Sequence, residues 1–180
     1  VAKEQLWSLK PIVDHPVPTT TSGWAETPID HFLSERHAAK RLIPVADASP
    51  RDLLRRISFD LIGLPPTYDE LVSFEREFTI EKYAAVVDEM LASPQFGERW
   101  GRHWLDIARY AESNGNDRNV IFPHAWRYRD YVIQSFNEDK PYDQFVREQI
   151  AGDLIPSDGW RQRDEQLVAT GFLTLGSKVL

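Results

Sequence analysis

The sequence predicts an all-α protein, an irregular multi-helix bundle of about seven or eight helices with an extended, Pro-rich N-terminal arm. Helix start signals recur along the chain, each an N-cap residue followed by Pro or by an acid three positions on. No run of alternating apolar and polar residues is long enough to make a useful strand. At 180 residues and 42% hydrophobic composition, the chain is large enough to bury a core.

The arm covers residues 1–26, where three prolines and a Thr/Ser/Gly cluster favour an extended chain. We expect Trp7 and Trp24 to attach it to the helical domain, which follows over residues 27–180. The apolar run 171–180 resembles the start of another element, so we expect a domain truncated at its C-terminus and a longer parent protein.

The helices follow in order from their start and stop signals. The start signals are Thr27-Pro28 with Asp30, Ser49-Pro50 with Asp52, Thr67 with Glu70, and Ser93-Pro94. Gly63 with Pro65-Pro66 ends the second helix, and Lys140-Pro141 separates the sixth from the seventh. The predicted helices lie near residues 28–42, 50–62, 68–77, 80–92, 95–112, 124–137, 142–151 and 163–174.

Composition excludes several classes of function. A net charge of −7 with interleaved acids and bases argues against a nucleic-acid surface, which needs a basic footprint. The absence of Cys excludes disulfides, thiolate metal sites and covalent haem attachment within this chain. No apolar run approaches the roughly 20 residues of a membrane span. No pair of His has the spacing of a helical metal site, so we expect no metal, and no nucleophile elbow or phosphate-binding loop is present.

The densest group of reactive side chains lies in residues 97–115. A helical wheel places large apolar side chains on one arc, expected to be core: Phe96, Trp100, Trp104, Ile107, Ala108 and Ala111. Arg99, His103 and Tyr110 fall at its boundary, where a polar end can point into a cleft. If a site exists, we expect a cleft formed by Arg99, His103, Asp106, Tyr110, Glu112, Asn114 and Arg129. His103 also fits a boundary histidine satisfied by one hydrogen bond.

The turn over residues 112–119 is rich in oxygen ligands, but its spacing does not match a calcium loop. A helix end closed by Asn114-Gly115 explains the same residues.

Two charges fall where the wheel requires apolar residues. Asp60 lies in the arc of helix 50–62, and Arg129 lies in the arc of helix 124–137. Because an unpaired buried charge costs several kcal/mol, we expect both to be largely buried in ion pairs. Partners open to Arg129 are Asp60, Asp106 and Glu112, while Asp60 can also pair locally with Arg56. Such a pair can be structural, or Arg129 can bind an anionic ligand in a cleft.

Four segments carry a resemblance to a known family. They are FDLIGLPPT (59–67), LASPQFGERWGRHWLDIARYAESNG (91–115), WRYRDYVIQSFNEDKPYDQFVREQIAGDL (126–154) and ATGFLTLG (169–176). In this order they resemble the domain of unknown function found in planctomycete proteins beside cytochrome c domains. The resemblance implies an extracytoplasmic parent protein, periplasmic or secreted, in which haem c belongs to a neighbouring domain. It implies no established reaction.

Three functions remain open. The chain is a non-catalytic scaffold or interaction module for neighbouring domains, a carbohydrate-binding or glycan-processing domain with an aromatic and carboxylate cleft, or a component of an electron-transfer assembly. Burial of Trp100, Trp104 and Trp126 together would remove the main support for a carbohydrate cleft.

Overall fold

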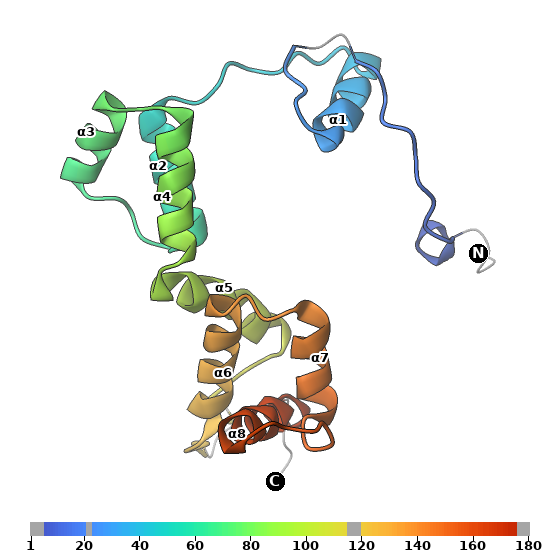
Figure 1. Cartoon of the computed structure of the whole chain (residues 1–180), viewed down its shortest axis with the longest axis vertical. Helices are drawn as coiled ribbons and strands as arrows, with labels where there is room; N and C mark the ends of the chain where they lie inside the picture. Colours follow the sequence, from blue (N-terminus) through green and yellow to red (C-terminus); the bar gives the residue numbers. More distant parts are fainter. Residues whose placement is uncertain (1–5, 21–22, 115–119, 176–180) are drawn as a thin grey trace. The chain divides into compact units, whose positions relative to one another are not determined.

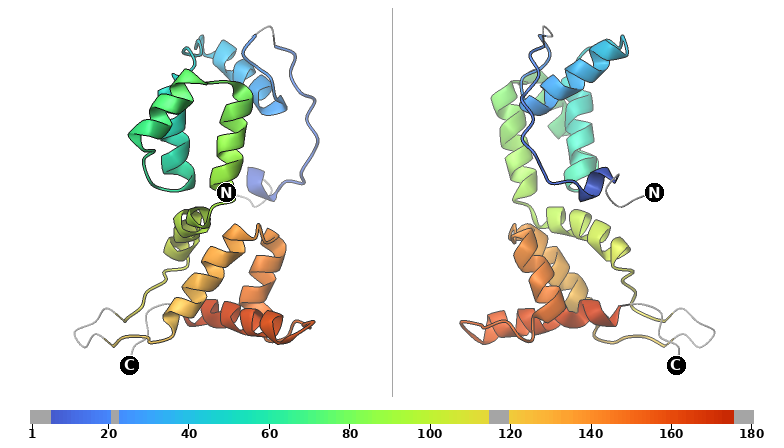
Figure 2. Two further views of the ribbon diagram at one scale, coloured as in Figure 1. Left: turned by 60° about the vertical axis from the view of Figure 1, so that its left-hand side comes forward. Right: turned by 90° about the vertical axis from the view of Figure 1, so that its right-hand side faces the viewer.

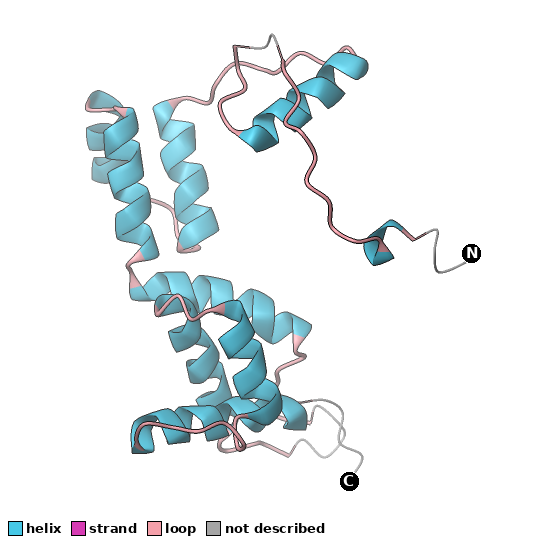
Figure 3. Cartoon of the chain, turned by 45° about the vertical axis from the view of Figure 1, so that its right-hand side comes forward, coloured by secondary structure: helices cyan, strands magenta, loops and turns pink. Residues whose placement is uncertain are grey.

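The computed structural model describes residues 6–20, 23–114 and 120–175, and the chain divides into two compact units, residues 1–47 and 48–180 (Figure 1). Each unit is described by itself. Every regular element within the described ranges is helical, and Figure 3 draws no strand there. The predicted all-α class is confirmed.

The first unit contains the short 3-10 helix η2 (Trp7–Leu9) and α1 (Pro28–Ala39). The predicted N-cap is present, since the Asp30 amide donates to Thr27 Oγ1 at 3.3 Å and the Thr27 amide donates to the Asp30 carboxylate at 2.8 Å. The ring of Trp24 lies 6.0 Å from that of His37, so this residue does attach the arm to α1. The Trp7 side chain lies outside the described part of the chain.

The second unit begins with α2 (Pro50–Leu61), α3 (Tyr68–Arg76) and α4 (Ile80–Leu91), with α2 and α4 side by side in Figures 1 and 2. Hydroxyl caps begin all three helices. Gly63 ends α2 as predicted, with the left-handed φ of 76° that favours glycine. Leu54 and Phe74 are buried among these helices.

The main core forms between the helices that follow. These are α5 (Pro94–Ile107), α6 (Ala125–Asn137), α7 (Tyr142–Ala151), α8 (Trp160–Ala169) and the 3-10 helix η3 (Thr170–Thr174). A short link makes α6 and α7 antiparallel, and α8 crosses the ends of both that lie away from this link (Figures 1 and 3). Tyr128, Tyr131, Val132, Phe145 and Ala169 make up the buried cluster.

Helix α5 packs on α6 through glycine, which corrects the predicted core arc. Gly97 and Gly101 are buried, whereas Ile107 is 76% exposed and Trp100 is 37% exposed. The Gly97 amide donates to Asn137 Oδ1 at 2.7 Å, which shows how closely the two backbones approach. A helical wheel drawn from large apolar side chains therefore assigns the wrong face of α5 to the core. The close contact between α5 and α6 is made by glycines, which have no side chain.

The C-terminal end of α5 also differs from the prediction. The helix ends at Ile107 rather than near residue 112, because Arg109 adopts a left-handed conformation with φ 56°. The Tyr110 amide then donates to the Leu105 carbonyl at 2.9 Å, and the Arg109 amide donates to the Asp106 carbonyl at 3.2 Å. This is a Schellman closure, so the predicted end at Asn114-Gly115 is wrong. Gly115 itself lies outside the described residues.

Candidate functional site

Three of the predicted cleft residues come together beside α6. The Tyr110 hydroxyl donates to Glu112 Oε1 at 3.0 Å, and the Arg129 guanidinium donates to the same oxygen at 2.7 Å. Arg129 also contacts Asp130 at 3.0 Å. Burial and the hydrogen bond to the Glu112 carboxylate raise the pKa of Tyr110 to about 12. The Tyr110 hydroxyl therefore stays protonated at neutral pH.

Asn114 positions the turn that follows this group. Its side-chain oxygen accepts from the Val120 amide at 3.0 Å, and its own amide donates to the Val120 carbonyl at 3.2 Å. A single antiparallel bridge joins Ser113 to Ile121 in the same place. Asn114 thus joins the two sides of this turn through Val120, rather than closing a helix end as predicted.

Arg99, His103 and Asp106 do not join this group. Arg99 donates through Nε to the Phe59 carbonyl at 3.2 Å, at the end of α2. His103 is exposed and lies edge-on to Trp100, with ring centroids 5.3 Å apart. Asp106 is exposed near the end of α5. The seven predicted cleft residues are therefore distributed over separate surfaces of the second unit.

The two charges expected to be buried are not. Asp60 is exposed, and no other described residue forms an ion pair with it. Its backbone carbonyl accepts instead from Trp100 Nε1 at 3.0 Å. The Arg129 side chain is 39% exposed, although one of its three open partners, Glu112, does pair with it. The helical wheel predicted the burial of Asp60 wrongly, because α2 buries the face that carries Leu54 and Ser58, and Asp60 lies outside that face.

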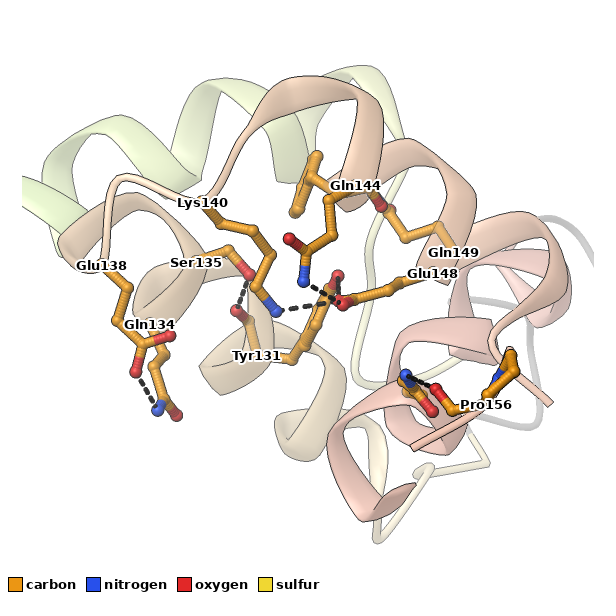
Figure 4. A network of polar contacts seen from close by, with 11 residues as sticks. Tyr131, Gln134, Ser135, Glu138, Lys140, Gln144, Glu148, Gln149 and Pro156 are labelled. Atoms are coloured by element: carbon orange, nitrogen blue, oxygen red, sulfur yellow. Dashed lines mark hydrogen bonds and ion pairs between the residues drawn. The ribbon is translucent and has the colours of Figure 1, made fainter. Parts of the chain in front are cut away.

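The charged pair that is buried joins α7 to the link before it. Lys140 Nζ donates to Glu148 Oε2 at 2.8 Å, with side chains 9% and 3% exposed (Figure 4). The Tyr131 hydroxyl and the Gln144 amide each donate to the same carboxylate at 2.8 Å. Burial raises the pKa of Glu148, but the hydrogen bonds from Lys140, Gln144 and Tyr131 outweigh it and hold that pKa below its usual value.

This network was not predicted from the sequence, although a signal for it exists. Glu148 lies three residues after Phe145, the buried anchor of α7, so a wheel drawn for residues 142–151 places a carboxylate beside an apolar side chain. The charges expected to be buried were Asp60 and Arg129, and Lys140 with Pro141 was expected only to separate two helices.

A second polar group crosses the aromatic core. Trp104 Nε1 donates to Gln149 Oε1 at 3.0 Å, and the Tyr128 hydroxyl lies 2.5 Å from the same oxygen. The Gln149 side-chain nitrogen donates in turn to the Phe145 carbonyl at 3.0 Å. Burial raises the pKa of Tyr128 to about 12. These bonds fix the register of α5, α6 and α7, because each buried polar atom needs its particular partner.

The polar side chains described so far mostly form hydrogen bonds with one another. This arrangement is more typical of a structural role than of a catalytic site. No cluster of three or more His, Asp or Glu within the described ranges is arranged to hold a metal ion. None of the described helices is long and apolar enough to cross a membrane. What the arrangement provides is a rigid helical frame with a charged group, Tyr110, Glu112 and Arg129, at its edge.

The fold defines a small helical domain whose buried polar side chains bond to one another and fix how its helices pack. The comparisons with known proteins place it more closely. Residues 28–179 match the family PSCyt2, described as a protein of unknown function (DUF1549), and the chain belongs to this family. The match confirms the resemblance to the planctomycete cytochrome c associated domain. No curated protein and no solved structure matches the chain.

Proposed function

We propose that this chain is a non-catalytic helical interaction module of a larger extracytoplasmic protein, in which it packs against neighbouring domains and haem c belongs to one of them. The observation that carries the proposal is the exposure of large apolar side chains at the end of α7, in the link that follows it and at the start of α8. Ile150 is 58% exposed, Leu154 is 78% exposed and Trp160 is 75% exposed.

We interpret these exposed apolar side chains as part of a surface that another protein covers. The polar interior of the same region supports this interpretation, because Glu148 and Gln149 of α7 are bonded inward and hold the helix rigidly. Ile150 near the end of α7 and Leu154 in the turn after it therefore form a suitable surface for a neighbouring domain.

The test supplies the neighbouring domains of the parent polypeptide as separate proteins and measures their binding to this chain by calorimetry. We expect at least one to bind, and the double variant I150K/L154K to weaken binding at least about tenfold, since burying one aliphatic side chain contributes about 1.5–3 kcal/mol. The matched control is I107K, which changes an isoleucine on α5 that is more exposed than Ile150. The proposal is wrong if no neighbouring domain binds or if both variants weaken binding equally.

A second candidate function, carbohydrate binding, keeps specific support. Trp100 and Trp126 are 37% and 45% exposed, so the condition that would have removed the aromatic cleft is not met. The Arg127 guanidinium lies 5.6 Å from the centroid of the Trp126 ring. Oligosaccharide binding that is lost in W126A and retained in W24A would favour this function over the first.

A further inference from the structure

A pocket of about 620 Å³ lies where the start of α6 meets the end of α8 and η3. The charged side chains among the described residues that line it are those of Arg109 and Arg127, with His124 beside them and no Asp or Glu. The chain as a whole carries a net charge of −7, so this sign is opposite to that of the molecule. The remaining lining is largely apolar and includes Phe122, Pro123, Leu167, Val168 and Leu175.

No carboxylate among the described residues neutralises the two arginines of this pocket. Neither Arg109 nor Arg127 forms an ion pair with another described residue. The neighbouring Arg129 differs, because Glu112 and Asp130 both contact it. The guanidinium of Arg127 lies 5.6 Å from the ring centroid of Trp126, and no described residue accepts a hydrogen bond from it. Two like charges at one cavity favour the binding of an anion.

We propose that this pocket binds a small organic anion, a carboxylate attached to an apolar body. The cavity volume falls within the usual range of ligand pockets, which combine apolar walls with a few polar groups. Arginine favours a carboxylate because its planar donors match both oxygens. An inorganic anion satisfies the arginines but leaves Phe122, Leu167 and Val168 uncovered, so the apolar body is part of the recognised chemistry.

The direct test is an amide chemical-shift titration of the full chain with 4-phenylbutyrate, its neutral amide 4-phenylbutyramide, and inorganic phosphate. We expect the carboxylate to shift amides of pocket residues such as Ala125 and Gly171 with saturation at millimolar concentration or below. The neutral amide and phosphate should each bind at least about tenfold more weakly, since each lacks one of the two recognised features.

Two variants test the arginines without unfolding the domain. R109G removes the side chain from a left-handed position that glycine adopts without strain, so the fold keeps its stability while carboxylate binding falls at least about threefold. R41G is the matched control, because Arg41 has the same φ of 56° at the end of α1 and does not line the pocket. R127Q should weaken binding similarly.

The control for R127Q is R161Q. Arg161 lies over the ring of Trp160 as Arg127 lies over the ring of Trp126, but Arg161 does not line the pocket. Weaker binding in R109G and R127Q with unchanged binding in R41G and R161Q supports the site. The proposal is overturned if the neutral amide or phosphate binds as well as the carboxylate. It is also overturned if no pocket amide shifts at tens of millimolar carboxylate, or if a control variant weakens binding as much as its pocket counterpart.

Discussion

At the scale of single residues, the pair Lys140 and Glu148 is the most sensitive point of the second unit. Replacing Lys140 with Met leaves the Glu148 carboxylate buried without its cation, so we expect the free energy of unfolding to fall by about 3–5 kcal/mol. The measurement is chemical denaturation. R147Q serves as the control, because the exposed pair of Arg147 and Asp143 should contribute less than about 1 kcal/mol. Equal losses in both variants would contradict the buried pair.

The same carboxylate gives a pH dependence with a definite sign. The pKa of Glu148 is lowered in the folded state, because hydrogen bonds from Lys140, Gln144 and Tyr131 outweigh the effect of burial. Its contribution to stability is therefore fully present above its unfolded pKa of about 4.5 and is lost as pH falls through the lower folded pKa. We expect the stability of wild type over E148Q to shrink between pH 5 and pH 3 or so in denaturation experiments. A difference that grows on acidification would reverse the assigned shift.

How far residues could be predicted depended on whether their partners were local. The Asp30 and Glu70 caps were predicted because each partner is three residues away. Glu112 was one of three partners considered for Arg129, since the intervening turn was visible in the sequence. The burial of Asp60 was predicted wrongly, because which face of α2 is covered depends on α3 and α4 rather than on α2 itself.

At the scale of elements, we expect replacement by alanine to have opposite effects on stability at two glycines of α5, Gly97 and Gly101. A Cβ on Gly97 would fall on the Ile133 carbonyl oxygen and within 2.6 Å of the Asn137 side chain. We expect G97A to destabilise the protein by about 1–3 kcal/mol despite the higher helix propensity of alanine. A Cβ on Gly101 meets only ordinary contacts, the nearest being Ile133 Cγ1 at 3.4 Å. G101A should therefore lie between neutral and a gain of about 1 kcal/mol in thermal or chemical unfolding. Similar effects of both substitutions would show that α5 and α6 do not approach closely at Gly97.

Helix starts were more predictable than helix ends for a physical reason. Thr27, Ser49 and Thr67 cap through their own side chains, so the signal is in the residue type. Helices α1 and α5 end where Arg41 and Arg109 adopt a left-handed conformation that arginine disfavours. Local backbone hydrogen bonds close both helix ends there, so the residue type does not mark them.

At the scale of the whole molecule, fold class and family followed from the sequence, while the site did not. Helical period and capping are repeated many times along the chain, so errors at single residues do not change the class. A site depends on a few side chains brought together from distant segments. The pocket beside α6 illustrates this, since Arg109 and Leu167 meet there from segments far apart in the sequence.

The division of the chain at residue 47 leads to the last prediction. The buried cluster of Tyr128, Tyr131 and Phe145 and both internal polar networks lie wholly within residues 48–180. Since this cluster and these networks include no residue of 1–47, we expect a chain that begins at Ala48 to fold. Its midpoint of chemical denaturation should stay close to that of the full chain, and its near-ultraviolet circular dichroism should retain the signal of Trp104 in a packed environment. Loss of that signal, or a broad transition, would mean that residues 1–47 complete the core of the second unit.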